Sequence, residues 1–227
     1  MLKTLRYQQD AIDDLLKKTL DILSNYSLRD RTKLQLKAPT GAGKTVIMAQ
    51  YLKRLAEELP HTDDLPHRRF AFIWIAPNQL HRQSFDRLNA FFADNRALSC
   101  LDVNTLTERE LLPNQILFAN WQSISGANRV LLTPNESGHY LGNVLDNTHR
   151  AGTELIVILD EAHLFASTGE KASDTLKMIG AAVEVDVSAT PLFEKADYQV
   201  NIPRPAVVKA QVIKKTAKLN DNLDLDK

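Results

Sequence analysis

The sequence predicts an α/β fold in which a mainly parallel sheet is flanked by helices. Short apolar runs of strand length, such as 70–76 and 155–159, alternate with longer stretches whose apolar residues recur at helical spacing. A continuous apolar run is typical of a strand that is buried on both faces of a parallel sheet. Polar residues follow directly on several of these runs, so we expect functional side chains to gather along the edge where the strands end.

The composition is that of an ordinary globular protein. The chain has 227 residues, 44% of them hydrophobic, and a net charge of +0. Cys100 is the only cysteine, which excludes an internal disulfide and a zinc site of the cysteine type. No apolar run approaches the ~18 residues of a membrane helix, and the N-terminus lacks the apolar core of a signal peptide. We therefore expect a cytoplasmic protein without a membrane partner.

The first elements surround a glycine-rich turn. Residues 8–23 predict an amphipathic helix, and 34–37 predict a strand that runs into Ala38. A strand, a glycine-rich turn ending in Gly-Lys-Thr and a helix start are the layout of a phosphate-binding loop. The loop residues after Ala38 are Pro39, Thr40, Gly41, Ala42, Gly43, Lys44 and Thr45. The strict pattern has glycine where Ala38 stands, so the first turn must form without it.

The residue types in this loop suit phosphate chemistry. Gly41 and Gly43 let successive backbone N–H groups point inward at phosphate oxygens. The helix that begins near Lys44 adds the positive end of its dipole. The Lys44 ammonium can reach the β- and γ-phosphates, and the Thr45 hydroxyl suits Mg²⁺.

The remaining elements follow from the same patterns. Pro60 ends the helix after the loop, and beyond Tyr198 the regular pattern is lost. The region from Gly126 to Gly152 is polar and is expected to be surface loop, apart from one apolar stripe at helical spacing over 140–145. The predicted strands are 34–37, 70–76, 98–103, 116–119, 155–159 and 183–187. The predicted helices are 8–23, 44–59, 80–92 and 172–180.

Two carboxylates follow the most apolar strand. Asp160 comes directly after 155–159, and in a nucleotide-hydrolysing fold this position holds Mg²⁺. Glu161 can orient or deprotonate an attacking water. A pair of acids at a loop start is common by itself, but phosphoryl transfer needs a phosphate cradle, a metal holder and a water-positioning group. The chain offers all three at strand ends.

Four motifs occur in the order found in superfamily 2 helicases of the DEAD/DEAH group, which the chain resembles. They are 38–45, Pro77-Asn78-Gln79-Leu80, Asp160-Glu161-Ala162-His163 and Ser188-Ala189-Thr190. Tyr7-Gln8-x-x-Ala11 is similar to the short upstream motif whose glutamine reads adenine. The stretches 74–78 and 118–123, and the approach Thr148-x-Arg150-x-Gly152, resemble the helicase subunit of type III restriction enzymes. The resemblance covers roughly residues 2–215.

The resemblance implies a RecA-like P-loop NTPase domain over residues 1–202, followed by the flexible start of an interdomain connection over 203–227. ATP and Mg²⁺ are the implied cofactors, with Lys44, Asp160 and Glu161 catalytic and Gln8 at the adenine. The implied coupling residues, which link the nucleotide state to the nucleic-acid side, are His163, Ser188, Ala189 and Thr190. The implied nucleic-acid contacts are Pro77, Asn78, Gln79, Gln83, Asn120, Gln122 and Ser123.

The chain departs from the family by lacking a second RecA-like domain, which carries the arginines that stabilise the transition state. We therefore expect this chain to bind ATP and Mg²⁺ but to hydrolyse ATP poorly by itself. DNA is favoured over RNA, and a partner could supply the second domain or a modification subunit. The alternative is a non-catalytic, nucleotide-dependent binding module completed by a partner chain. A small-molecule kinase is disfavoured, because it would not need the Ser188-Ala189-Thr190 motif.

Overall fold

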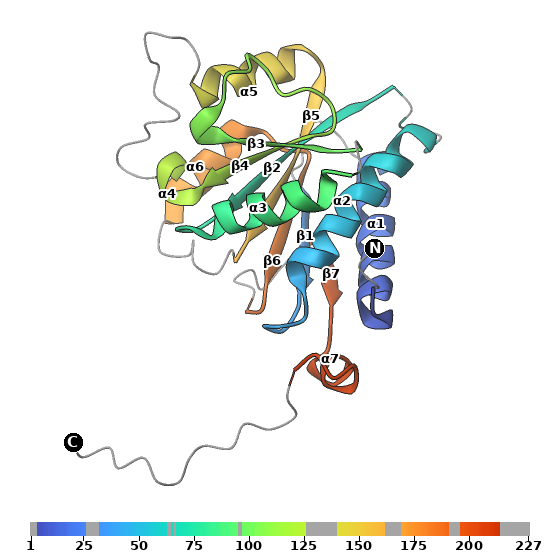
Figure 1. Ribbon diagram of the computed structural model, residues 1–227. Coiled ribbons are helices and arrows are strands. Elements are labelled where there is room, and N and C mark those ends of the chain that lie inside the picture. The colour runs from blue at the N-terminus through green and yellow to red at the C-terminus, as the bar shows by residue number, and fades with distance from the viewer. Residues whose placement is uncertain are drawn as a thin grey trace, which may run out of the picture.

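A seven-stranded parallel sheet forms the centre of the computed structural model (Figure 1). The structure describes residues 4–25, 32–62, 65, 67–94, 97–125, 140–161, 169–190 and 196–213. The strand order is β3-β4-β2-β5-β6-β1-β7, and every pairing is parallel. The strands are β1 (Thr32–Lys37), β2 (Arg69–Ala76), β3 (Ser99–Asp102), β4 (Gln115–Asn120), β5 (Thr153–Asp160), β6 (Val183–Ser188) and β7 (Tyr198–Asn201). The predicted α/β fold with a parallel sheet is confirmed.

Helices cover both faces of this sheet (Figure 1). One face packs against α1 (Arg6–Asn25), α2 (Lys44–Glu58) and α3 (Leu80–Phe92). The other packs against α5 (Leu141–Arg150), the short α4 (Trp121–Ser125) and α6 (Gly169–Ile179). Single 3-10 turns, η1 (Leu59–His61) and η2 (Val103–Thr105), follow α2 and β3. No helix in the described ranges is long and apolar enough to cross a membrane.

The continuous apolar runs arise because both faces of the central strands are buried. On β2, Phe72 and Trp74 lie in the core beneath α1, α2 and α3. Ile73 and Ile75 alternate with them and lie in the second core, beneath α4, α5 and α6. Side chains alternate across a strand, so a strand between two helical layers buries both of its faces and is mostly apolar.

Two elements near the end of the described chain were not predicted. β7 is a four-residue edge strand, and α7 (Arg204–Lys209) follows it after Pro203. Residues from 203 onward are predicted to begin an interdomain connection. In the structure, Val207 on α7 is fully buried, whereas most other side chains of 203–213 are exposed or partly exposed. Residues 214–227 fall outside the described ranges, so the proposed boundary at 202 stays a prediction.

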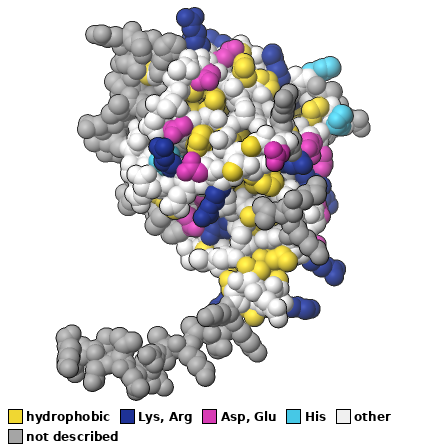
Figure 2. Space-filling view, viewed as in Figure 1, with side chains coloured by type: hydrophobic (Ala, Val, Ile, Leu, Met, Phe, Trp, Pro, Cys, Tyr) yellow, Lys and Arg dark blue, Asp and Glu magenta, His cyan; other side chains and the backbone are white. Residues whose placement is uncertain are grey.

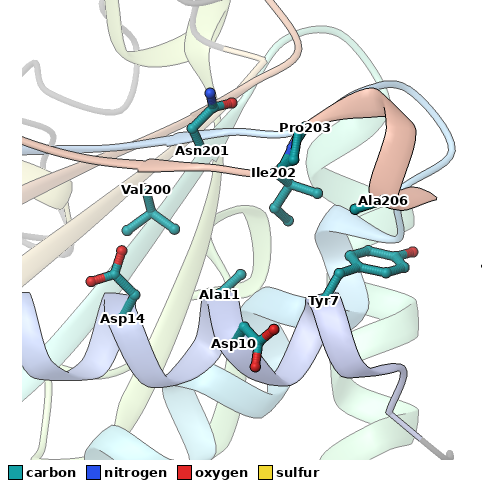
Figure 3. A pocket seen from close by; sticks show the side chains of 9 residues that line it. All are labelled: Tyr7, Asp10, Ala11, Asp14, Val200, Asn201, Ile202, Pro203 and Ala206. Atoms are coloured by element: carbon teal, nitrogen blue, oxygen red, sulfur yellow. The ribbon is translucent and has the colours of Figure 1, made fainter. Parts of the chain in front are cut away.

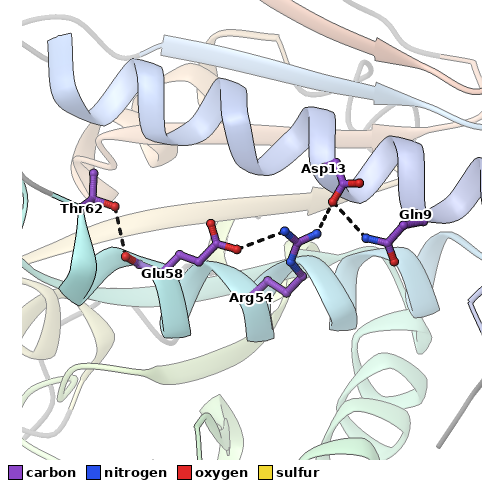
Figure 4. A network of polar contacts seen from close by, with 5 residues as sticks. All are labelled: Gln9, Asp13, Arg54, Glu58 and Thr62. Atoms are coloured by element: carbon purple, nitrogen blue, oxygen red, sulfur yellow. Dashed lines mark hydrogen bonds and ion pairs between the residues drawn. The ribbon is translucent and has the colours of Figure 1, made fainter.

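Two arginines, Arg54 and Arg68, make polar contacts near opposite ends of α1. Arg54 on α2 bonds Asp13 on α1 and Glu58 one turn further along α2, and Gln9 donates to the same Asp13 carboxylate at 2.9 Å (Figure 4). The hydrogen bond from Arg54 holds the pKa of Asp13 below its usual value. At the other end of α1, Arg68 binds both carboxylate oxygens of Glu154 at 2.6 and 2.5 Å.

We expect the second contact to stabilise the fold more than the first. Arg68 is three-quarters buried and also donates to the carbonyl oxygen of Leu23 at 2.6 Å. Arg68→Met leaves that carbonyl and the Glu154 carboxylate without a donor, which should lower the free energy of unfolding by about 2 kcal/mol. Arg54→Met removes a more exposed contact and should cost about 0.5 kcal/mol. Urea unfolding of both variants measures the difference, and equal losses would contradict this ranking.

Candidate phosphate and metal site

The predicted phosphate loop joins the end of β1 to the start of α2. Gly41 and Gly43 adopt φ angles of 83° and 82°, in the left-handed region that favours glycine. Ala38 is fully buried, and its N–H donates to the carbonyl of Ser188 on β6 at 3.1 Å. Its backbone is not among the residues with positive φ, so the missing glycine of the strict pattern is not required at this position. The helix begins at Lys44, as predicted.

The first turn of α1 holds the outside of this loop. The carbonyl of Ala42 accepts hydrogen bonds from the Tyr7 hydroxyl at 3.0 Å and from Gln8 Nε2 at 3.1 Å. Gln8 Oε1 in turn accepts from the backbone N–H of Leu5 at 3.0 Å. A Cβ at Gly43 would lie 2.7 Å from Gln8 Nε2, so a larger residue there would displace Gln8. Gln8 therefore positions the loop, and its contact with adenine stays a prediction.

The two predicted carboxylates lie within reach of the loop lysine. Asp160 ends β5, and Glu161 Oε1 lies 2.9 Å from Lys44 Nζ. Glu161 has a φ of 54°, and its N–H donates to the carbonyl of Val187 at 2.8 Å. A glutamate in the left-handed region is uncommon and is a feature of functional sites. Residues far apart in the sequence, Lys44 and Glu161, thus form the centre of one site.

The carboxyl group of Asp160 resists ionisation. Burial raises its pKa to about 6, and the negative charge of Glu161 acts in the same direction. The charge of Lys44 and the hydroxyl of Ser84, which lies 3.4 Å from Asp160 Oδ2, lower the pKa. The positive charge of Lys44 is therefore shared with Glu161 and does not fully offset the burial of Asp160.

The donors at this point fit Mg²⁺. Mg²⁺ prefers carboxylate and hydroxyl oxygens and keeps several waters, so one or two protein ligands suffice. Asp160 and the half-buried hydroxyl of Thr45 supply such oxygens. The buried indole N–H of Trp74 lowers the pKa of Asp160 but has no partner within hydrogen-bond geometry among the described residues, and a metal-bound water would give it an acceptor. Over the described ranges, no group of three or more His, Cys, Asp and Glu residues could hold a metal.

The Ser188-Ala189-Thr190 motif lies beside the loop. Ser188 ends β6 and is fully buried, and its Oγ accepts a hydrogen bond from the N–H of Thr190 at 3.2 Å. The carbonyl of Ser188 is the acceptor for the first loop residue, Ala38. Ala189 is half-buried between Ser188 and Thr190. His163 lies outside the described residues. The structure thus supports contact between this motif and the loop, and its coupling role stays a prediction.

The residues predicted to face nucleic acid come together at the ends of β2 and β4. Asn78 has a φ of 51°, its N–H donates to Gln122 Oε1 at 3.0 Å, and Gln122 Nε2 donates to Asn78 Oδ1 at 3.2 Å. Asn120 Nδ2 donates to the Asn78 carbonyl at 2.5 Å. His81 Nδ1 also contacts that carbonyl at 2.8 Å. These amides hold one another in place.

The other predicted contacts surround this network of Asn78, Asn120 and Gln122. Pro77 is buried, Ser123 is half-buried, and Gln79 and Gln83 are exposed. On the face shown in Figure 2, acidic and basic side chains are interspersed.

Sequence reasoning missed several members of the site. Ser84 and Trp74 act on Asp160, and Tyr7 holds the loop, but none of them was assigned a role. The signal for Ser84 was its place on the buried face of α3, which it shares with His81, Leu88 and Phe92. Trp74 lies within an apolar run, where a tryptophan is expected as part of the core. Only the fold shows that its indole N–H acts on Asp160 at the end of β5.

The raised pKa of Asp160 predicts a pH-dependent cost in stability. A folded-state pKa above the unfolded value means that stability is fully present below about pH 4 and is lost as the pH rises through 6. Asp160→Asn cannot ionise, so without Mg²⁺ and nucleotide it should gain about 3 kcal/mol over the natural chain between pH 4 and pH 8. Urea unfolding across this range measures the difference. Asp94→Asn, at an exposed position, is the control, and a pH-independent difference for Asp160→Asn would contradict the assignment.

The chain is similar to known proteins in its sequence and in its fold. Residues 1–193 match the family described as type III restriction enzyme, res subunit. No curated protein matches the sequence. Among solved structures, the chain is similar to the SWI2/SNF2 ATPase core of Sulfolobus solfataricus, solved in complex with dsDNA. The TM-score is 0.52 and the identity 14%, over 84% of this chain and 32% of that one.

A second solved structure, PCH-2 of C. elegans, aligns with a TM-score of only 0.29 and 13% identity, over 73% of this chain and 43% of that one, and it carries no argument. The chain spans about a third of the length of the archaeal ATPase core, and that similarity shows the fold of a RecA-like helicase domain. The family match covers most of the chain. The chain therefore belongs to the family of the res subunit of type III restriction enzymes, as a first RecA-like domain of superfamily 2 helicase type.

Proposed function

We propose that this helicase-type ATP-binding domain binds ATP with Mg²⁺ and hydrolyses it as part of a DNA translocase of restriction type. The observation that carries the proposal is the 2.9 Å contact between Lys44 and Glu161. It brings the cation of the phosphate loop and the carboxylates of β5 to one point, which is the arrangement that phosphoryl transfer requires. The family match supports the restriction type of motor.

Each residue then has a separate task. Lys44 leaves Glu161 and holds the β- and γ-phosphates, while the N–H groups of the loop and of the α2 N-terminus bind their oxygens. Thr45 and Asp160 would hold Mg²⁺, which would neutralise charge on the phosphates. Glu161, freed from Lys44, orients the attacking water and accepts its proton. Ser188, through its bond to Ala38, transmits the state of the loop to β6.

We propose DNA as the track on which the motor acts. The amide network of Asn78, Asn120 and Gln122 lies at the same edge of the sheet as the phosphate loop, because both follow the carboxyl ends of parallel strands. Contacts of amides and backbone to a phosphodiester chain position a strand without reading its sequence. The archaeal ATPase core of similar fold was solved with dsDNA, which favours DNA over RNA.

Full activity is proposed to need a second RecA-like domain, whether it follows in a longer chain or comes from a partner. Such a domain supplies arginines that stabilise charge on the γ-phosphate, and an arginine of this kind is worth about 10³–10⁵ in rate. A modification subunit is a further proposed partner, on the basis of the family. If hydrolysis is absent even with these partners, the chain is instead a nucleotide-dependent binding module.

ATP binding should depend on Lys44. Lys44→Ala removes a charge-assisted contact to the phosphates and should weaken ATP affinity by about a hundredfold, measured by isothermal titration calorimetry with Mg²⁺. Lys53→Ala is the matched control, since Lys53 lies on the same helix and only pairs with Glu57 at 3.8 Å. Unchanged affinity in Lys44→Ala would show that the loop assignment is wrong.

Hydrolysis of ATP should depend on groups that ATP binding does not require. In a steady-state assay, we expect the 227-residue chain to hydrolyse ATP slowly with or without DNA, and Glu161→Gln to abolish the residual activity while ATP still binds. Asp94→Asn serves as the exposed carboxylate control. Robust DNA-stimulated turnover by the chain alone would refute the requirement for a second domain.

A further inference from the structure

The face of α3 that packs on the sheet carries two polar residues one helical turn apart. His81 and Ser84 are both buried, and the other buried residues of this helix, Leu88 and Phe92, are apolar. Residues three positions apart lie on the same face of a helix. Buried polar groups in folded proteins have hydrogen-bond partners, so the partner of each side chain indicates what it does.

The partner of Ser84 belongs to the proposed metal site. Ser84 Oγ donates to Asp160 Oδ2 at 3.4 Å, although the two residues are 76 positions apart in the sequence. This hydrogen bond engages one oxygen of the carboxylate and favours one orientation of the Asp160 side chain. The other oxygen, Oδ1, would then serve a metal ion or its bound water.

The partner of His81 belongs to the network of Asn78, Asn120 and Gln122. His81 Nδ1 lies 2.8 Å from the carbonyl oxygen of Asn78. A carbonyl only accepts hydrogen bonds, so Nδ1 carries the hydrogen and donates it. Asn120 Nδ2 donates to the same carbonyl, and Gln122 holds the N–H of Asn78. His81 thereby fastens the first turn of α3 to the ends of β2 and β4.

Aromatic packing holds this part of α3 from the side of the sheet. Phe85, the neighbour of Ser84, packs edge-to-face on Phe118 of β4, with 5.5 Å between the ring centroids. Phe118 in turn stacks on Trp74 of β2 at 5.9 Å. Edge-to-face and stacked pairs are favourable arrangements of aromatic rings. The position of Ser84 relative to β2 and β4 is therefore fixed by its neighbour in the chain.

Two cavities of the domain lie away from this turn. One of about 310 Å³ lies between α1, β7 and α7, with Tyr7 on one wall and Ala206 on the opposite one (Figure 3). Another of about 340 Å³ lies between α2 and the later part of α3, beside Leu88. Neither is lined by His81 or Ser84. Because close-packed interiors have low compressibility, we expect this turn to hold its side chains in place.

We propose that Ser84 is a positioning residue for the metal site and that His81 positions Ser84, so that α3 holds Asp160 in the orientation that binds Mg²⁺. The inference rests on the proposed function, because it requires that Asp160 takes part in binding Mg²⁺ with ATP. Groups that hydrogen-bond a metal ligand orient it, and their loss typically lowers metal affinity by about 10- to 100-fold. The turn of α3 that Asn78 anchors is thus the turn that orients Asp160.

The test for Ser84 compares ATP affinity in Mg²⁺ with ATP affinity in EDTA, both measured by isothermal titration calorimetry. In Ser84→Ala, the gain in ATP affinity that Mg²⁺ provides should fall by about tenfold, while the affinity in EDTA stays that of the natural chain. Ser84→Thr keeps the hydroxyl and should restore the gain. Asn89→Ala, at an exposed position of the same helix, is the control and should bind like the natural chain.

Two results would overturn the role of Ser84. One is an unchanged gain from Mg²⁺ in Ser84→Ala. The other is an equal loss of affinity in Mg²⁺ and in EDTA, which is what a merely structural contribution to the fold predicts.

His81 provides a second test that leaves Ser84 and Asp160 unchanged. His81→Leu removes the donor to Asn78 and should reduce the same gain by about threefold, a smaller effect because it acts through Ser84. His81→Asn offers an amide N–H in place of Nδ1 and should retain the gain. A gain in His81→Leu equal to that of the natural chain would refute the role of His81.

The failure of this inference differs from that of the proposed function. If the natural chain does not bind ATP, or binds it equally with and without Mg²⁺, the proposed function fails and the inference fails with it. If Asp160→Asn reduces the gain from Mg²⁺ but Ser84→Ala and His81→Leu do not, only the inference is refuted.

Discussion

The parallel register of β5, β6 and β1 is the constraint on which the site depends. Asp160 lies opposite Val187, and Lys37 lies opposite Ser188, so these three strands end at almost the same level. The phosphate loop comes directly after β1, the carboxylates lie at the end of β5, and the Ser188 motif lies at the end of β6, so all three meet at one edge of the sheet. An antiparallel strand at any of these places would carry its functional residue to the opposite edge of the sheet. The positions of the functional residues are thus determined first by strand direction and then by side-chain packing.

The side chains at the strand ends carry more negative than positive charge. One ammonium faces two carboxylates, of which Glu161 forms the ion pair and Asp160 is buried beside it. A bound Mg²⁺ would reverse that balance and favour anionic phosphate. Metal and nucleotide are therefore expected to assist each other's binding, because each offsets a charge that disfavours the other.

The sequence predicted the class of fold and most strands, and it drew attention to the loop and the carboxylates, whose roles stay predictions, but it did not reveal the full architecture around them. Apolar runs located six strands, and the loop and Asp160-Glu161 stood out because their residue types have few other uses together. β7 was missed because an edge strand of four residues, Tyr198–Asn201, leaves almost no periodicity to detect. Strand order also depends on contacts between distant segments that one sequence does not reveal.

The alternation on β6 predicted a strand correctly but gave no sign that its polar positions are covered. Glu184 and Asp186 are each only 4% exposed, although alternating valine and acid usually indicates one face in water. Similarly, Gln8 reads as an ordinary helix residue, and only the fold brings it to Ala42. Such positions are determined by what packs over them, which is a property of the assembled chain.

The position of β1 in the sheet also has a consequence for synthesis. Both partners of this strand, Val183–Ser188 and Tyr198–Asn201, leave the ribosome long after it. At about 5–20 residues per second, β1 waits on the order of ten seconds with its backbone groups and apolar side chains unpaired. During that interval it is a candidate for pairing with other nascent chains. The strand that carries the phosphate loop can therefore pair only after the distant strands β6 and β7 have been synthesised.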